Sequence, residues 1–228
     1  MNFELKGKRA IVSAGGSGIG RSIVSEFIKQ GVSVSTCDID KSLVRELKTK
    51  YPQIYAEVVD VADEKSVKEF CAKSIKFSGG LDFLVNNAGV AGPTLSIEEI
   101  NGADWSHCLN VCLSSQFYFV KYCLKHLRES TSASIVNLSS AAGKYGFAFR
   151  TPYASAKWGV IGLTKSLSIE LGKDKIRVNA ILPGLVAGDR QQNVLRNKAQ
   201  MLGKSFDEVE EEALSFTSIK EYVDAQDI

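Results

Sequence analysis

Short apolar runs rich in β-branched residues alternate along the chain with longer segments whose apolar residues recur at helical spacing. This alternation is typical of a parallel sheet covered by helices on both faces. The short runs predict six strands, at Arg9–Ser13, Val32–Cys37, Ile54–Val59, Phe83–Asn86, Ser134–Leu138 and Ile176–Leu182. The fold class expected from this pattern is α/β.

The longer segments predict helices between the strands. After the first strand, apolar residues from Ile19 to Ile28 fall on one helical face, and Gly31 follows where a helix would end. Later helices are predicted at Asp63–Ser78, Asp104–Arg128 and Pro152–Leu171. No repeat, linker or low-complexity tract interrupts the series, so residues 1–228 are expected to form a single domain.

The last part of the chain leaves the alternating pattern. Residues 188–215 are interpreted as two short helices broken at Gly203, long enough to cover a pocket as a lid. The segment 224–227 resembles a helix N-cap with an acidic first turn, yet the sequence stops at Ile228 before an apolar face appears. We therefore expect a truncated sequence whose sheet lacks a seventh strand; the alternative is a natural terminus.

Composition and charge narrow the classes of partner. Lysine and arginine total 28 against 26 aspartate and glutamate, and the two signs are interspersed, which argues against the basic stripe of a nucleic-acid-binding protein. No stretch approaches the ~18 apolar residues of a membrane span, so no membrane partner and a cytoplasmic location are expected. A small-molecule partner fits this composition best.

The cysteines and histidines give no sign of a metal site. The five cysteines form no C-x-x-C pair and are odd in number, which favours reduced thiols in the core over a disulfide framework or a zinc site. His107 and His126 fall on one predicted helix without further ligands around either, so no catalytic metal is expected. The cysteines are Cys37, Cys71, Cys108, Cys112 and Cys123.

A glycine-rich turn follows the first predicted strand. The segment SAGGSGIG, from Ser13 to Gly20, opens directly into the first amphipathic helix. Glycines permit close backbone approach, and a helix N-terminus offers free N–H groups and a positive dipole end to a diphosphate. This context indicates a dinucleotide site, although the same pattern also occurs as a simple tight turn.

Asp38 ends the second predicted strand, close to where a ribose-binding carboxylate is expected. Such a carboxylate accepts hydrogen bonds from the ribose hydroxyls and repels a 2′-phosphate, and neither Ser17 nor Ile39 supplies a compensating cation. NAD is therefore expected in preference to NADP as the cofactor. The alternative is that Asp38 belongs only to a strand-end turn.

Several motifs, in the right order, resemble those of the short-chain dehydrogenase/reductase (SDR) family over essentially the whole chain. The glycine-rich turn resembles the family's T-G-x-x-x-G-I-G motif. The others are Asp60-Val61, Asn86-Asn87-Ala88-Gly89, Asn110, Ser139-Ser140, Tyr153-Ala-Ser-Ala-Lys157 and Pro183-Gly184. The resemblance implies a doubly wound Rossmann fold with strand order 3-2-1-4-5-6. It also implies a homo-tetramer or homo-dimer assembled through the two long predicted helices, Asp104–Arg128 and Pro152–Leu171.

The chemistry of alcohol oxidation explains why a tyrosine and a lysine are needed. Taking hydride from a secondary alcohol also requires removing its hydroxyl proton, so a base must lie within hydrogen-bond reach. An isolated tyrosine, with a pKa of about 10, is too weakly ionised for this near neutral pH. Tyr153 and Lys157 are four residues apart on one predicted helix and share a face, and a neighbouring ammonium stabilises a phenolate. Tyr153 is therefore the predicted acid/base.

The resemblance also implies roles for the other site residues. Lys157 would bind the nicotinamide ribose, Ser140 would hold the substrate oxygen, and Asn110 would anchor a water of the proton relay. Ser140 is chosen over Ser139 because it lies thirteen residues before Tyr153, the family's usual separation. The cofactor-binding residues implied are Ser13, Gly15, Ser17, Gly18, Ile19, Asp38, Asp60, Val61, Asn87, Ala88, Gly89, Tyr153, Lys157, Pro183, Gly184 and Val186.

Two positions depart from the family's pattern. Ala14 replaces the first glycine of the fingerprint, and altered cofactor affinity rather than its loss is expected if the φ of Ala14 is negative. Gly188 stands where the family often has a threonine that contacts the nicotinamide carboxamide. The details of nicotinamide anchoring are therefore in doubt.

Two variable stretches, Lys144–Arg150 and Asp189–Met201, are expected to select the substrate. Arg150 and Arg190 are the cations nearest the predicted site, and either could pair with a carboxylate or phosphate of the substrate. The alternative is that both are solvated or paired with acidic side chains. Three aromatic residues of the first stretch could line an apolar wall or serve simple packing: Tyr145, Phe147 and Phe149.

The leading hypothesis is an NAD-dependent oxidoreductase that transfers hydride between nicotinamide and a secondary alcohol or ketone, such as a polyol, sugar, hydroxy acid or 3-oxoacyl compound. The alternative from another class is a catalytically silent nucleotide-binding regulator with the same fold. The full set of Asn110, Ser140, Tyr153 and Lys157 argues against that alternative. A dehydratase or epimerase would use a similar tyrosine and lysine, but such relatives usually carry a larger C-terminal substrate domain.

Overall fold

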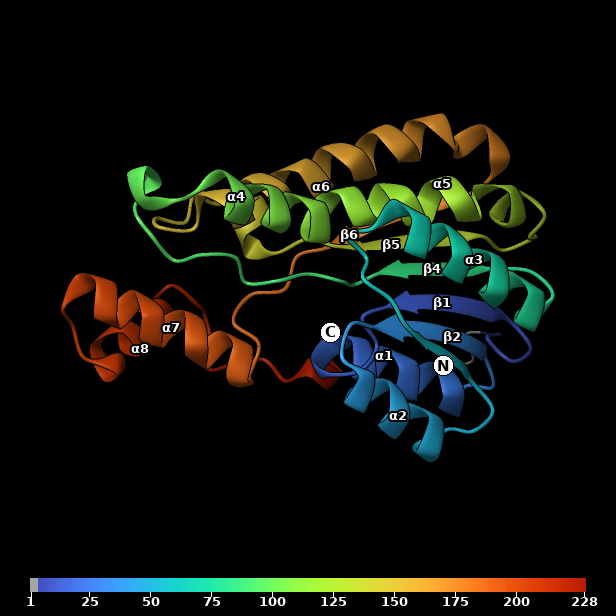
Figure 1. Cartoon of the computed structure of the whole chain (residues 1–228), viewed down its shortest axis with the longest axis horizontal. Helices are drawn as coiled ribbons and strands as arrows, with labels where there is room; N and C mark the ends of the chain where they lie inside the picture. The colour runs from blue at the N-terminus through green and yellow to red at the C-terminus, as the bar shows by residue number, and fades with distance from the viewer. Residues whose placement is uncertain (1–3) are drawn as a thin grey trace.

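The six strands form one parallel sheet in the order β3-β2-β1-β4-β5-β6, in a computed structural model that describes residues 4–228 (Figure 1). The strands are β1 (Arg9–Ser13), β2 (Ser33–Asp38), β3 (Tyr55–Val58), β4 (Phe83–Asn86), β5 (Ser134–Leu138) and β6 (Arg177–Ile181). The α/β class and the strand order expected from the sequence are confirmed, with shifts of one residue at some strand ends.

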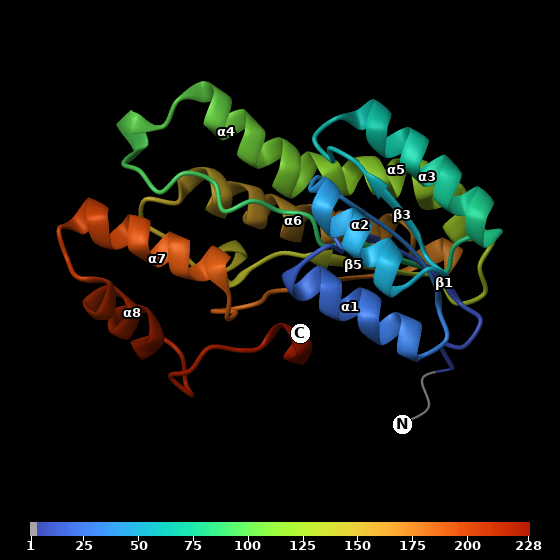
Figure 2. The ribbon, with the colours of Figure 1, turned by 60° about the horizontal axis from the view of Figure 1, so that its bottom comes forward.

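Helices cover both faces of this sheet (Figure 2). On one face, α1 (Gly18–Lys29) and α2 (Lys41–Lys50) bury an apolar cluster against the strands. On the other face, α3 (Glu64–Ser78), α5 (Ser115–Arg128) and α6 (Thr151–Glu170) enclose a larger cluster. Neighbouring residues of β1 contribute to opposite clusters, which explains why the strands have nearly continuous apolar runs.

Helix α2 is absent from the sequence prediction. Asp40 caps it by accepting hydrogen bonds from the backbone N–H groups of Ser42 at 2.7 Å and Leu43 at 3.4 Å. Only Val44 and Leu47 of this helix are buried. So narrow an apolar stripe on a short charged segment gives a weak periodic signal.

The single helix predicted at Asp104–Arg128 is divided in the structure. It consists of α4 (Gly102–Leu109), a π-helical turn at Asn110–Ser114, and α5. A π turn inserts one residue into a helix without ending it, so the apolar pattern on either side gives no warning of it. Such turns are frequently found at functional sites, and this one begins at a predicted site residue.

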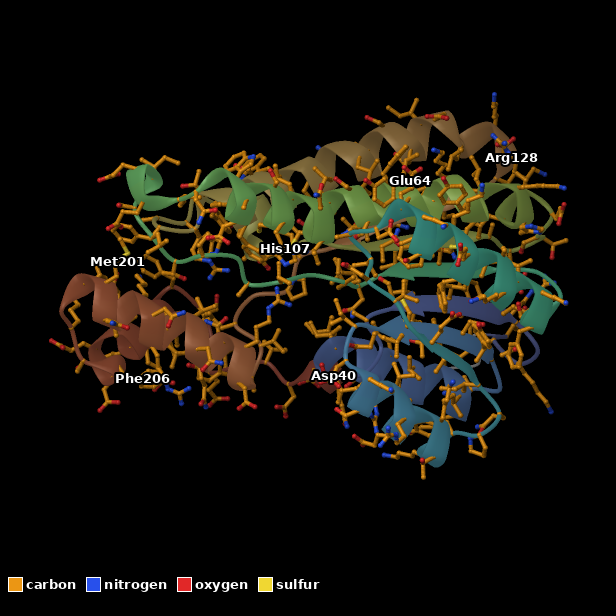
Figure 3. The ribbon with its side chains drawn as sticks, in the orientation of Figure 1. Asp40, Glu64, His107, Arg128, Met201 and Phe206 are labelled. Atoms are coloured by element: carbon orange, nitrogen blue, oxygen red, sulfur yellow. The ribbon has the colours of Figure 1, made fainter. Side chains whose placement is uncertain are left out.

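The chain after β6 forms a helical hairpin, as predicted. It comprises α7 (Asp189–Leu202) and α8 (Phe206–Ser215), separated at Gly203, whose φ of +63° is left-handed and favours glycine. The hairpin has its own apolar cluster, formed around Leu195, Ala199 and Val209. Figure 1 shows it beyond the carboxyl ends of the strands, and Figure 3 labels Met201 and Phe206 on its two helices.

The end of the chain returns to the first helix. A 3-10 helix at Ala225–Asp227 contacts α1, and Ile228 packs on the cluster beneath it. Val186 and Val223 pair as an isolated parallel bridge. Among residues 4–228 no seventh strand joins the sheet, so β6 is its edge strand.

Candidate active site

The glycine-rich turn joins β1 to α1 and has the shape of a diphosphate cradle. Ser17, the N-cap of α1, makes no side-chain capping bond, and the first turn of α1 has no acidic residue, so that helix end can receive an anion. A Cβ atom at Gly15 would lie 2.1 Å from Oγ1 of Thr36, whereas one at Gly18 would meet open space. These features fit a dinucleotide.

Ala14 departs from what the sequence analysis assumed. Its φ is +53°, whereas the expectation of retained cofactor affinity depended on a negative value. Alanine in this left-handed region carries a strain of about 1–2 kcal/mol. The carbonyl of Ala14 accepts a hydrogen bond from Asn87 at 3.0 Å in this conformation. Gly20 leaves room for the same oxygen, because a Cβ at Gly20 would lie 2.1 Å from it.

Asp38 lies against the turn, at the carboxyl end of β2. Its carboxylate is 8% exposed and accepts hydrogen bonds from the backbone N–H groups of Gly16 at 3.0 Å and Asp40 at 3.1 Å. The sequence analysis overlooked Arg21, which donates to the Gly16 carbonyl at 3.1 Å and pairs with Glu46 at 2.7 Å. A cation one turn into a helix that begins at a phosphate-binding turn is the signal that could have identified it.

The N-N-A-G segment is tied to the same turn. The backbone N–H groups of Asn87 and Ala88 both donate to Oγ of Ser13 at 3.0 Å, and the Asn87 amide donates to the Ser13 carbonyl at 3.1 Å. Asn86 is fully buried and donates to Asn137 at 2.8 Å. The segment therefore borders the glycine-rich turn and is held to it by these hydrogen bonds.

Tyr153 and Lys157 lie on α6, with the Lys157 ammonium 5.7 Å from the centroid of the tyrosine ring. The lysine side chain is buried, at 3% exposed, and Nζ donates to the carbonyl of Leu138 at 2.7 Å. A buried ammonium needs such a partner. Because Leu138 ends β5, this hydrogen bond fixes the charge of Lys157 at the carboxyl edge of the sheet.

Ser139 and Ser140 have different surroundings. Ser139 is buried and its hydroxyl donates to the backbone carbonyl of Lys157 at 2.8 Å, so it joins β5 to the helix of the predicted base. Ser140 is half-buried, and its hydroxyl oxygen accepts only from Ala142 at 3.2 Å within residues 4–228. Ser139 therefore has a structural hydrogen bond, whereas the Ser140 hydroxyl is the one of the two with capacity for a further partner.

Asn110 begins the π turn between α4 and α5, and it is exposed. Its side-chain oxygen accepts a weak hydrogen bond from Ser114 at 3.4 Å. The π turn packs against α6, the helix that carries Tyr153. The irregular turn therefore places Asn110 on the same side of the sheet as the tyrosine.

Two arginines accompany Lys157 around Tyr153. The guanidinium carbon of Arg150 lies 4.7 Å from the tyrosine ring centroid and that of Arg190 lies 6.0 Å away. Tyr145, another predicted substrate residue, is 58% exposed, and its ring contacts Lys144. The structure thus brings both arginines to the site, whereas Tyr145 lies on the surface.

Two thiols lie close to these cations. Cys108 and Cys112 are buried one helical turn apart, and Cys112 accepts a hydrogen bond from the N–H of Val90 at 3.4 Å. A hydrogen bond from Cys108, together with the charges of Lys157 and Arg190, lowers the pKa of Cys112 against the opposing effect of burial. The shared hydrogen bond raises the pKa of Cys108.

The segment after β6 closes the site from the other side. The carbonyl of Pro183 accepts a hydrogen bond from the N–H of Ala141 at 2.9 Å, which ties this segment to the loop after Ser140. Gly188 has a φ of +133° and is the N-cap of α7. A threonine would be strained there, so the departure at this position has a conformational reason.

The described part of the chain contains neither a cluster of metal ligands nor a membrane-spanning helix. Among residues 4–228, no group of three or more potential ligands is arranged to hold a metal ion. Within the same range, no helix is both long and apolar enough to cross a bilayer. All five cysteines are free and buried.

Comparison with known proteins places the chain in a family. Residues 8–199 match the family model for short chain dehydrogenase. The 3-oxoacyl-(acyl-carrier-protein) reductase FabG of Thermotoga maritima is 36% identical over 188 residues, which cover 81% of this chain and 76% of that protein.

Two solved structures share the fold. An actinorhodin polyketide ketoreductase with NADPH has a TM-score of 0.90 and 27% identity, covering 100% of this chain and 88% of the other. A NAD⁺-bound xylitol dehydrogenase has a TM-score of 0.91 at 23% identity, covering 98% and 89%. The chain belongs to the short-chain dehydrogenase/reductase family of oxidoreductases, whose members act on alcohol and ketone groups with a nicotinamide cofactor.

Proposed function

We propose that this protein is an NAD-dependent dehydrogenase/reductase of a secondary alcohol or ketone, with Tyr153 as its acid/base. The observation that carries the proposal is the arrangement on α6, where the Lys157 ammonium lies 5.7 Å from the tyrosine ring centroid and is fixed by the Leu138 carbonyl. The tyrosine that would exchange a proton with the substrate oxygen therefore lies beside a fixed ammonium group.

The reaction divides between hydride and proton. When bound, the nicotinamide supplies the acceptor for the hydride of the carbinol carbon, or its donor in the reverse direction. Tyr153 takes the hydroxyl proton as the C–H bond breaks and the carbonyl forms. Lys157 would bind the nicotinamide ribose hydroxyls, Ser140 would hydrogen-bond the substrate oxygen, and Asn110 would hold the water that carries the proton onward.

The preference for NAD over NADP rests on Asp38. Its buried carboxylate borders the diphosphate cradle, and a 2′-phosphate beside it would meet like charge. The nearby charge of Arg21 is paired with Glu46 and so offers little compensation. We expect Asp38→Asn to lower the ratio of kcat/KM for NAD to kcat/KM for NADP by at least tenfold. An unchanged ratio would contradict the assignment of Asp38.

A homo-oligomer is proposed from the outer surface of α5 and α6. Three large apolar side chains are exposed on these neighbouring helices: Phe117 at 48%, Trp158 at 52% and Ile169 at 84%. Burial against a second copy would remove them from water. Light scattering coupled to size-exclusion chromatography tests this, and a monomer at micromolar concentration would contradict it.

The activity itself is tested by initial rates with NAD and NADP in parallel, across secondary alcohols, polyols, sugars and hydroxy acids. We expect turnover that favours NAD and falls by at least about a hundredfold in Tyr153→Phe. Tight NADH binding without turnover of any substrate class would instead favour a silent nucleotide-binding regulator. Far-UV circular dichroism of the variant controls for folding.

A further inference from the structure

The surroundings of Tyr153 carry more positive charge than proton abstraction requires. Arg150 precedes α6, Lys157 lies one turn beyond the tyrosine, and Arg190 lies in the first turn of α7, yet all three cations lie within 6.0 Å of the ring centroid. The neighbouring Cys112 thiol has a lowered pKa and can carry a compensating negative charge. Even as a thiolate, Cys112 neutralises one of three charges.

Neither arginine has an acidic partner within residues 4–228. Arg150 donates to the carbonyl of Ala91 at 2.7 Å, and Arg190 donates to the carbonyl of Gly89 at 3.1 Å. By contrast, the partly buried side chain of Arg9 pairs with Asp82. The two site arginines therefore keep donor groups that their backbone contacts do not use.

Arg150 is the more costly of the two to leave unpaired. It is half-buried, and its Nε lies out of contact with solvent without a hydrogen-bond partner among the described residues. Burial lowers the pKa of Arg150, and the charge of Arg190 adds to that effect. A desolvated guanidinium is stabilised by a carboxylate, which matches its planar donors in two parallel hydrogen bonds.

We propose that Arg150 and Arg190 bind a carboxylate of the substrate, so that the reacting compound is a short hydroxy acid or the corresponding oxo acid. Both guanidinium groups lie within 6.0 Å of the ring centroid of Tyr153, whose phenolic oxygen would take the proton, so we expect the carboxylate to lie close to the carbinol carbon, as in a 2-hydroxy or 3-hydroxy acid. This inference rests on the proposed function. Arg190 additionally links substrate binding to the α7–α8 hairpin, which we expect to act as a lid.

The test compares matched acids and esters. Oxidation of 2-hydroxybutanoate and 3-hydroxybutanoate is measured beside oxidation of their methyl esters, in the wild type, Arg190→Gln and the control Arg196→Gln. Arg196 lies on the same helix; its guanidinium donates hydrogen bonds to Gln192 and Asn193 and lies over the Phe206 ring, away from Tyr153. We expect the wild type to prefer an acid, and Arg190→Gln to raise the KM of that acid about tenfold to a hundredfold. The rates of Arg196→Gln should change less than about threefold, and in Arg190→Gln the KM of the ester should rise less than the KM of the acid.

Two outcomes would overturn the inference, and each can be told apart from a failure of the proposed function. Wild-type esters that react as well as the acids would overturn the inference while the dehydrogenase stands. A loss in Arg190→Gln confined to the Kd of NADH would also overturn it, because the arginine would then serve the cofactor's diphosphate.

Binding provides a measurement that does not need turnover. NADH fluorescence of the enzyme–NADH complex is titrated with each hydroxy acid and with its ester. Saturable binding of an acid that weakens about tenfold in Arg150→Gln or Arg190→Gln supports the carboxylate site even if the proposed reaction fails. Absence of acid binding at millimolar concentrations in the wild type would overturn it.

Discussion

Replacing Asp82 by asparagine should destabilise the protein without altering the active site. The Asp82 carboxylate precedes β4 and accepts hydrogen bonds from the backbone N–H of Arg9 at 2.9 Å, from the Arg9 guanidinium at 2.8 and 3.1 Å, and from the hydroxyl of Ser130 at 2.6 Å. These contacts join the amino ends of β1 and β4 to the segment before β5. The predicted catalytic residues lie at the opposite, carboxyl ends of the strands.

The size of the effect follows from the burial of this pair. Exposed ion pairs contribute about 0–1 kcal/mol, whereas removing one partner of a buried pair costs about 3–5 kcal/mol. The Asp82 side chain is 5% exposed and that of Arg9 is 30% exposed, so the pair lies between these limits. We expect Asp82→Asn to lower the free energy of unfolding by about 2–3 kcal/mol near neutral pH.

The loss should depend on pH in a defined direction. Burial alone would raise the pKa of Asp82, but hydrogen bonds from Arg9 and Ser130 outweigh it and lower the pKa. A lowered folded-state pKa stabilises the protein above the unfolded value of about 4 and ceases to do so as the pH falls through the folded-state value. The difference in unfolding free energy between wild type and Asp82→Asn is therefore largest at neutral pH and decreases below about pH 4.

Urea denaturation at a series of pH values measures this gap. Glu26→Gln serves as the control, since Glu26 belongs to an exposed pair with Lys29 and should show no measurable loss. A loss for Asp82→Asn below about 1 kcal/mol, or one that does not change between neutral and acid pH, would refute the reasoning. NADH affinity should remain at the wild-type value throughout.

Three further substitutions test the framework of the site. Ala14→Gly should relieve the left-handed strain and raise the unfolding free energy by roughly 0.5 kcal/mol, net of the entropy of glycine; thermal denaturation measures it, and a loss would contradict the strain. Gly15→Ala should weaken NADH binding at least about tenfold because its Cβ would overlap Thr36, and fluorescence titration with unchanged Kd would contradict this. Ser139→Ala should cost about 0.5–1.5 kcal/mol of stability by removing its buried hydrogen bond to the Lys157 carbonyl, as urea denaturation would show; an unchanged midpoint would contradict it.

Much of the fold could be predicted because its signals are local. The strands are short segments rich in buried and β-branched residues, and Gly203 ends α7 through a conformation that glycine favours. Helix α2 was missed because only two of its side chains are buried. The π turn at Asn110–Ser114 was missed because the apolar pattern continues on both sides of it.

The site was predictable where spacing along one element determines proximity. Tyr153 and Lys157 share a helix, so four residues of separation suffice to bring them together. The convergence of Arg190 on Gly89 joins residues 101 positions apart, and it depends on how the chain after β6 folds back over the sheet. The conformation of Ala14 was likewise set by tertiary contacts with Asn87 and not by its own preference.

Hydride transfer and cofactor binding, measured on the same samples of wild type and Tyr153→Phe, test the central claim most directly. The account predicts that deuterium from a carbinol-deuterated substrate appears on the reduced nicotinamide with the wild type. In Tyr153→Phe, NADH should bind with nearly unchanged affinity while transfer slows by at least about a hundredfold. Transfer at an undiminished rate in the variant would contradict the assignment of Tyr153 as the acid/base.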